Sequence, residues 1–148
     1  MTDAPDIDAL IDRLDLEPHP EGGYFRETWR SDLELPSDVL TPEHDGRRSA
    51  GTSILYLVPA DDDSAPHRVA SDELWLYHLG DPLELTVRRS LERPGDSVII
   101  GPGDDHRFQA QVPANHWQSA SSTGDDAGYT LVACVVVPGF DFDDFEMA

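Results

Sequence analysis

Short apolar runs separated by turn residues recur along the chain from Gly51 onward. Each run is rich in β-branched and aromatic residues, and the gaps between runs are rich in glycine, proline and aspartate, which is typical of β-strands joined by turns. The runs cover residues 52–58, 74–79, 83–89, 97–100, 107–112, 117–121 and 129–137. Many short strands with few helices predict an all-β fold, either an antiparallel sandwich or a barrel.

The first fifty residues add one helix, one strand and a long loop to this pattern. Apolar residues recur with helical spacing within residues 5–14, at Ile7, Leu10, Ile11 and Leu14. Prolines follow that helix, and residues 24–30 then have the composition of a strand. Residues 31–48 contain prolines, a glycine and acids, and are expected to form a long loop. The tail, residues 138–148, alternates phenylalanine with acids and is expected to pack its rings back as a lid or a short turn.

Length and charge limit the classes of protein that this chain can belong to. A chain of 148 residues suits one domain, which we expect to span residues 1–148. It carries 30 acidic and 10 basic residues, all of the latter arginine, for a net charge of -20. At about 20 Å in water each charge pair repels by roughly 0.2 kcal/mol, and the sum over all pairs exceeds a typical folding stability of about 5–15 kcal/mol. We therefore expect an acidic surface adapted to concentrated salt, and neither nucleic acid nor an anionic membrane as a partner.

Cysteine content and the chain's N-terminal sequence bear on location. The single cysteine, Cys134, lies in an apolar run and is expected to be a buried thiol, and one cysteine cannot form a disulfide within the chain. The sequence shows neither a signal-peptide pattern nor a run of about 20 apolar residues. These features predict a cytoplasmic protein.

The segment 67–80 combines a base, a carboxylate and a turn glycine in His67, Glu73 and Gly80. A strand here would place Glu73, Trp75 and Tyr77 on one face, and would place Leu74, Leu76 and His78 on the other. A polar and aromatic face backed by an aliphatic one predicts a lined cavity. His67 and Glu73 can meet in it if the chain bends between them as a hairpin.

Five segments in order along the chain resemble the cupin superfamily, and more closely its uncharacterised single-domain branch, sometimes called the fifth cupin family. They are residues 19–28, 71–75, 80–85, 112–118 and 137–146. The resemblance implies a jelly-roll barrel with a pocket inside it, and a homodimer. A fold alone does not establish an activity.

The chain departs from the pattern of the metal-binding cupins. Those proteins typically offer a second histidine two residues after the first, and a third histidine in the late motif, where this sequence has Val69 and Gln118. Tight binding of a transition metal generally requires three or four protein ligands, of which only His67 and Glu73 remain. We expect no cofactor, with a bound divalent metal as the less favoured alternative. His116 could supply a further ligand if its strand begins early enough.

His67 and Glu73 are the candidate catalytic residues. An imidazole with an ordinary pKa of about 6.5 suits proton transfer near neutral pH, and an inward carboxylate needs a partner, so Glu73 either orients His67 or binds an ion. Candidate substrate-binding residues are Tyr24, Arg26, Trp75, Tyr77 and Gln118. Arg26 could hold an anionic group bidentately or simply pair with an acid, and the aromatic residues could be ordinary core.

Three other histidines are expected outside this pair. We expect His19 and His44 on the surface, and His78 between the sheets or at a subunit contact.

Three functions fit these residues. The first is an isomerase or epimerase in which His67 is the general base, Glu73 fixes its tautomer, Arg26 holds an anionic group, and Tyr24 or Tyr77 donates a proton. The second is a module that binds a small molecule without chemistry. The third is a metal-dependent dioxygenase or isomerase.

Overall fold

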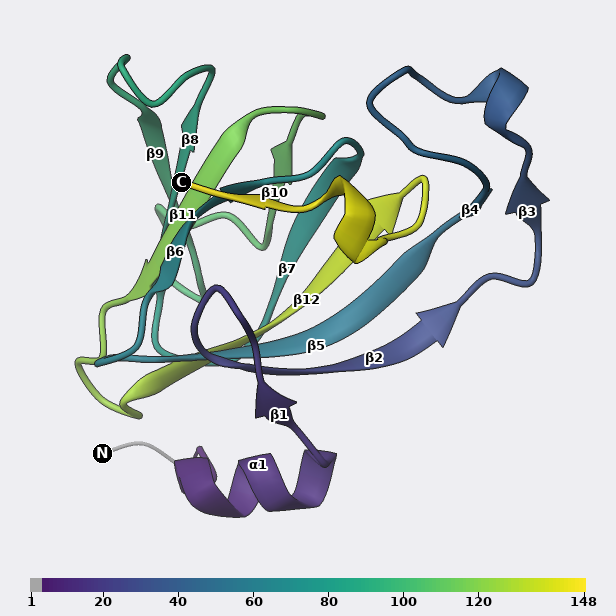
Figure 1. Cartoon of the computed structure of the whole chain (residues 1–148). Helices are drawn as coiled ribbons and strands as arrows, with labels where there is room; N and C mark the ends of the chain where they lie inside the picture. The colour runs from purple at the N-terminus through teal and green to yellow at the C-terminus, as the bar shows by residue number, and fades with distance from the viewer. Residues whose placement is uncertain (1–3) are drawn as a thin grey trace.

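The computed structural model describes residues 4–148. It contains two large antiparallel β-sheets that face one another, and a third sheet of only two short strands (Figure 1). The six-stranded sheet has the order β1 (Glu17–Pro18), β2 (Tyr24–Arg30), β5 (Thr52–Pro59), β12 (Tyr129–Val137), β7 (Asp72–Gly80) and β10 (Gln109–Val112). The five-stranded sheet has the order β13 (Glu146–Met147), β6 (Ser64–Arg68), β11 (Trp117–Ser122), β8 (Leu83–Arg88) and β9 (Asp96–Ile100). The predicted all-β fold with one short N-terminal helix is confirmed.

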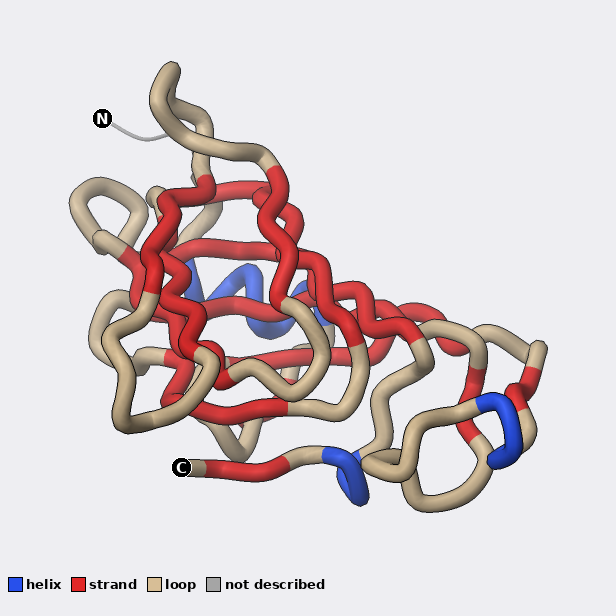
Figure 2. The backbone as a smooth tube through the Cα atoms, turned by 90° about the horizontal axis from the view of Figure 1, so that it is seen from above, coloured by secondary structure: helices blue, strands red, loops and turns tan. Residues whose placement is uncertain are grey.

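The short runs of strand-forming residues in the sequence predicted most of these strands. The strands predicted at residues 24–30 and 129–137 have the predicted bounds, and the other predicted strands differ by at most two residues at either end. The strand β6 was missed, because three aspartates precede it and Pro66 lies within it, as in a loop. The predicted loop at residues 31–48 contains two short strands, β3 (Glu34–Leu35) and β4 (Arg48–Ser49), and the 3-10 helix η1 (Ser37–Val39). Figures 1 and 2 both show this segment projecting from one end of the barrel.

The main hydrophobic core lies between the two sheets. It consists of alternate residues of facing strands: Tyr56, Val58, Trp75, Leu83, Leu85, Ile100, Ala110, Val112, Ala120, Val132 and Cys134. On β7 the predicted parity is confirmed, since Trp75 is buried while Leu74 and His78 face outward and are exposed. The side chain of Cys134 is buried, as predicted.

A second, smaller core covers the outer face of the six-stranded sheet. The helix α1 (Ile7–Leu14) begins at Asp6, whose carboxylate accepts hydrogen bonds from the backbone N–H groups of the first turn, and it ends at Asp15 in the left-handed conformation. Its apolar face packs Leu10 against Leu57 and Leu131. Figure 2 shows the helix (blue) against one side of the strands. Within residues 4–148, no helix is long and apolar enough to cross a membrane.

The chain changes sheets between His67 and Glu73. His67 lies on β6 of the five-stranded sheet, opposite Gln118 of β11, whereas Glu73 lies on β7 of the six-stranded sheet, opposite Val136 of β12. The expected hairpin between these two residues is therefore wrong. Residues 69–71 instead cross from one sheet to the other, which places the imidazole and the carboxylate on facing walls.

The C-terminal segment turns back over the same end of the barrel. After β12 it forms the 3-10 helix η2 (Phe142–Asp144) and then β13, which pairs with β6 so that Met147 lies opposite His67 (Figure 1, yellow). The predicted return of the phenylalanines onto the barrel is confirmed.

Candidate functional site

A small buried cavity lies between the sheets beneath the C-terminal segment. Eleven side chains line it: His19, Glu21, Phe25, Thr52, Ile54, His67, Val69, Glu73, Val136, Phe140 and Phe145. The volume of the cavity that is accessible to water is about 30 Å³, which is room for about two water molecules. The walls are mostly apolar, and two histidines and two glutamates supply groups that can exchange protons.

His67 is fixed in the cavity by a carboxylate that the sequence did not indicate. Its Nδ1 lies 2.7 Å from Oε2 of Glu21 and 2.8 Å from the carbonyl oxygen of Ala65. Since both neighbours are acceptors, Nδ1 carries a proton and donates it. The hydroxyl of Ser64 donates a short hydrogen bond to the same Glu21 oxygen. Among residues 4–148 Nε2 has no hydrogen-bond partner, so this ring atom is available to a molecule in the cavity.

The surroundings of His67 favour its charged form. Burial by itself lowers the pKa of this imidazole, but the hydrogen bond with Glu21, the charge of Glu21 and the charge of Glu73 outweigh burial and raise the pKa above 6.5. A larger fraction of this imidazole is therefore protonated at neutral pH than of a histidine in water, so more of it has an Nε2 proton to donate.

Glu73 lies on the facing wall and is held by a chain of two side chains. Gln118 donates from Nε2 to Oε1 of Glu73 at 3.0 Å, and the indole of Trp75 donates to Oε1 of Gln118 at 2.8 Å. The indole fixes which end of the Gln118 amide faces the carboxyl group. Burial raises the pKa of Glu73 to about 7, although the charge of His67 acts in the opposite direction. Glu73 can therefore both accept and release a proton near neutral pH.

A tight turn at residues 19–23 brings His19 and Glu21 into the barrel. Gly22 N–H donates to the carbonyl of His19, and both Gly22 (φ +108°) and Gly23 (φ +73°) adopt backbone conformations that favour glycine. A Cβ at Gly22 would collide with the carbonyl oxygen of Asp63. The chain can therefore pass close enough to β6 for Glu21 to reach His67 only with glycine at this position.

His19 is the second imidazole of the cavity. Its Nδ1 lies 3.1 Å from the backbone nitrogen of Glu21, which donates to it, and 3.2 Å from Oε1 of the Glu21 carboxylate. Burial is the main cause that lowers the pKa of His19, and the charge of His67 adds to it, while Glu21 acts in the opposite direction. The cavity thus pairs one imidazole that favours the charged form with one that favours the neutral form.

The structure brings together some of the candidate residues and separates others. His67 and Glu73 line one cavity, while Trp75 and Gln118 lie behind Glu73 and support it. Tyr77 packs against the main core and donates its hydroxyl proton to the carbonyl of Gly80, outside the cavity lining.

Tyr24 and Arg26 lie on the outer side of β2. Tyr24 packs in the small core beneath α1, and Arg26 is exposed, while Phe25 between them points into the cavity. The two residues share a face, as predicted, but it is the face that points away from the barrel interior. An anionic group in the cavity therefore has no guanidinium from Arg26.

The predicted places of the other histidines are partly wrong. His19 and His44 are both buried, and His44 bonds to the hydroxyls of Thr41 and Ser71. His78 is exposed and does not pack between the sheets. Glu21, and not Glu73, is the direct partner of His67. The paired glycines at residues 22–23, directly after Glu21, were the sequence signal for a close approach of the backbone here.

The residues of the cavity do not fit the four-ligand metal set of the cupins. Val69 is an apolar part of the wall, and both ends of the Gln118 amide are used by Glu73 and Trp75. His116 bonds through Nδ1 to the carbonyl of Ala114 and is not part of the lining. Across residues 4–148, no group of three histidine, cysteine, aspartate or glutamate side chains is placed to hold a metal ion.

Two facing antiparallel sheets with a histidine and a glutamate directed into the space between them define a cupin-type barrel. A family model described as "Cupin superfamily (DUF985)" matches residues 8–148, and the chain belongs to this family. A hypothetical protein from Leishmania major is similar, with 37% identity and a TM-score of 0.85 over 97% of this chain and 88% of that one. A protein from Shewanella oneidensis is similar with 31% identity and a TM-score of 0.83, over 98% of this chain and 85% of that one.

More distant structures share the fold. A single-residue variant of oxalate decarboxylase from B. subtilis has 15% identity and a TM-score of 0.59, over 90% of this chain and 30% of that one. A likeness at this identity concerns the fold alone, and it confirms the predicted cupin jelly roll. A search of curated proteins found no match.

Proposed function

We propose that the barrel cavity binds a small molecule and moves a proton on it, as an isomerase or epimerase does. The observation that carries this proposal is the pairing of His67 and Glu73 across one buried cavity. His67 offers a free Nε2 because Glu21 holds Nδ1, and Glu73 has a pKa of about 7. Two groups that exchange protons near neutral pH, on opposite walls, can act on two atoms of one ligand.

The pKa values of the two groups favour Glu73 as the base and His67 as the acid at neutral pH. The Glu73 carboxylate removes a proton from the carbon beside a carbonyl group, and His67 donates the Nε2 proton to the carbonyl oxygen as the enol forms. Return of the proton to a different position, or to the opposite face of the carbon, gives an isomer. These roles are the reverse of those expected from the sequence, because Glu21 raises the pKa of His67.

The lining of the cavity favours a neutral ligand. Within the described part of the chain, the lining contains neither arginine nor lysine, and its two glutamates disfavour an anion. Apolar side chains cover most of the remaining wall and exclude water, which strengthens the electrostatic contacts of both catalytic candidates. We infer a small neutral carbonyl compound and not the anionic ligand that Arg26 suggested.

Proton exchange with deuterated water tests this proposal without knowledge of the product. The protein is incubated in D2O with a panel of neutral two- to four-carbon hydroxyaldehydes and hydroxyketones, and loss of each C–H signal is followed by proton NMR. Exchange should be catalysed for at least one compound, and His67→Gln and Glu73→Gln should each lower its rate by about 100-fold or more.

The matched control is His78→Gln, which removes an exposed imidazole from the outer face of β7. It should exchange at the rate of the unchanged protein. Full exchange in His67→Gln would reject the acid role of this residue. Ligand-induced shifts of cavity signals without any exchange would reject catalysis and favour the binding module instead.

A further inference from the structure

The C-terminal segment closes the cavity with phenylalanine rings. The ring of Phe145 stacks on the imidazole of His67, with centroids 5.6 Å apart and planes 30° from parallel, and its centroid lies 6.0 Å from that of His19. Phe142 packs edge-on against Phe140 at 4.8 Å and against Phe145 at 5.8 Å. These rings cover the two histidines of the candidate site.

Phe145 and Val69 separate the cavity from a groove on the surface. Both side chains line the cavity, and both also line a groove of about 470 Å³ that is bordered by Arg68, Asn115 and Asp144. Withdrawal of the Phe145 ring would therefore join the cavity of about 30 Å³ to this larger space. A ligand of several carbon atoms needs that extra volume, because the closed cavity has room for only about two water molecules.

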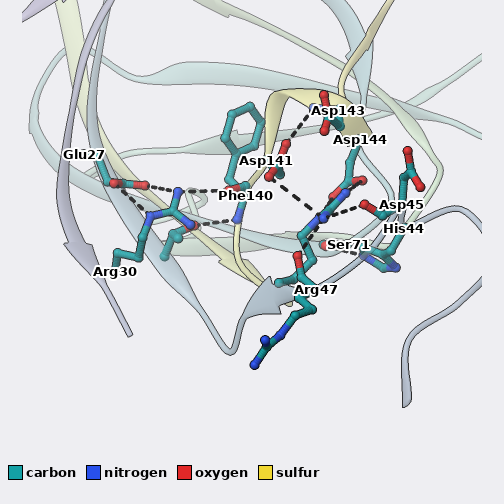
Figure 3. A network of polar contacts seen from close by, with 12 residues as sticks. Glu27, Arg30, His44, Asp45, Arg47, Ser71, Phe140, Asp141, Asp143 and Asp144 are labelled. Carbon is teal, nitrogen blue, oxygen red and sulfur yellow. Dashed lines mark hydrogen bonds and ion pairs between the residues drawn. The ribbon is translucent and has the colours of Figure 1, made fainter. Parts of the chain in front are cut away.

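One buried ion pair fastens the middle of the segment to the barrel. Arg48 donates from Nε to Asp144 Oδ2 at 2.8 Å and from Nη2 to Oδ1 at 2.7 Å, and only 4% and 3% of the two side chains are exposed. Figure 3 shows Asp144 within this network of polar contacts. The carbonyl groups of Asp45 and Arg47 accept further hydrogen bonds from Arg48, which fixes the guanidinium. A bidentate ion pair of this kind stabilises the contact and also fixes the relative orientation of the two side chains.

The contacts on either side of this pair differ in strength. Upstream, Gly139 N–H donates to the carbonyl of Ser49, and Phe140 N–H donates to the hydroxyl of Thr52, which anchors the segment to the barrel rim. Downstream, β13 has only two residues, both exposed, and the ion pair between Arg68 and Glu146 is also exposed. The part free to swing is therefore residues 141–148. Asp144 is its buried attachment; in addition, Asp141 Oδ2 lies 3.9 Å from Nη1 of Arg48, and Ala148 N–H donates to the carbonyl of Pro66.

We propose that residues 141–148 form a lid over the candidate site, that the Arg48–Asp144 ion pair is its latch, and that the ligand enters past Phe145. The inference rests on the proposed function in that it assumes a ligand for the cavity. It assigns roles to Arg48, Asp144 and Phe145 that the proton-transfer chemistry does not require.

Histidine modification by diethyl pyrocarbonate tests the lid without any ligand or turnover. The rates at His19, His67 and His78 are measured by mass spectrometry of peptides, in the unchanged protein and in Asp144→Asn. His19 and His67 should react at least about tenfold faster in the variant, because the buried ion pair is broken, while the exposed His78 should react at an unchanged rate. The matched control Glu146→Gln breaks an exposed pair in the same segment and should change the rates by less than about twofold.

Cys134 distinguishes lid opening from unfolding, because this thiol lies in the core between the sheets. Its rate of reaction with a bulky disulfide reagent should be the same in Asp144→Asn and in the unchanged protein. Equal acceleration at Cys134 and at the two cavity histidines, or no acceleration at the histidines, would overturn the lid.

Phe145→Ala provides a second variant if Asp144→Asn does not fold. It removes the ring from the wall, leaves the ion pair intact, and should accelerate modification of His67 in the same way. Absence of exchange in D2O would reject the proposed function and would leave these modification rates unaffected, so the two failures are distinguishable.

Discussion

The imidazole of His67 and the carboxylate of Glu21 meet at 2.7 Å inside the barrel, although the residues are far apart in the sequence. Both side chains are buried, so water screens their interaction little. The contact fixes the tautomer of His67, raises its pKa, and directs the other ring nitrogen away from the acid. The proposed chemistry depends on this contact more than on any other in the site.

The pKa of Glu73 predicts a pH dependence of stability. Its pKa is about 7 in the folded protein against 4.5 in the unfolded chain, so the folded protein binds more protons between these values and loses stability as the pH rises from 4.5 to 7. The loss amounts to about 3 kcal/mol. Glu73→Gln cannot titrate, so its free energy of unfolding relative to the unchanged protein should increase by about 3 kcal/mol between pH 4.5 and pH 8. Urea unfolding at several pH values measures this difference, and parallel curves for the two proteins would contradict it.

The turn at residues 19–23 predicts an unequal response to two glycine substitutions. Gly22 and Gly128 both have positive φ, but only at Gly22 would a Cβ meet another part of the chain. Gly128→Ala should cost about 1–2 kcal/mol from the backbone conformation alone, whereas Gly22→Ala should cost more and should displace Glu21 from His67.

Chemical unfolding and NMR titration of His67 together check this prediction. The pKa of His67 should fall in Gly22→Ala and stay unchanged in Gly128→Ala. Equal destabilisation by the two substitutions would show that the close approach of Gly22 to β6 is unimportant.

The net charge of -20 predicts a strong dependence of stability on salt. Repulsion among the excess carboxylates is weakened as the Debye length shrinks to about 3 Å at 1 M salt. We expect the far-UV circular dichroism signal of the folded protein to be lost at low ionic strength and to recover in molar potassium chloride. A spectrum that does not change over this range would reject the adaptation to salt.

Local alternation predicted the strands well, and on β7 it also predicted the inward face, but on β2 it could not show which face points inward. Tyr24 and Arg26 share a face of β2, and docking of α1 over that side of the sheet makes it the outer one. The decision depends on a contact between distant parts of the chain, which the local pattern of residues 24–30 does not contain.

Convergence of His67 and Glu73 in one cavity was predicted, but the partner of His67 was not. Glu21 reaches His67 because the turn at residues 19–23 bonds to residues 62–65. Gly23 N–H donates to Asp62, and Ala65 N–H donates to the carbonyl of Glu21. The turn has no periodic pattern, and β6 was not predicted as a strand because it contains Pro66. The sequence therefore contains no periodic signal that these two segments pair.

The tautomer and pKa of His67 test the central claim most directly. Long-range proton–nitrogen NMR spectra recorded over a pH series report both quantities for each imidazole. The account predicts that neutral His67 carries its proton on Nδ1, that its pKa exceeds 6.5, and that Glu21→Gln lowers this pKa while Glu17→Gln, an exposed change on β1, does not. A neutral His67 protonated on Nε2, or a pKa that is unaffected by Glu21→Gln, would contradict it.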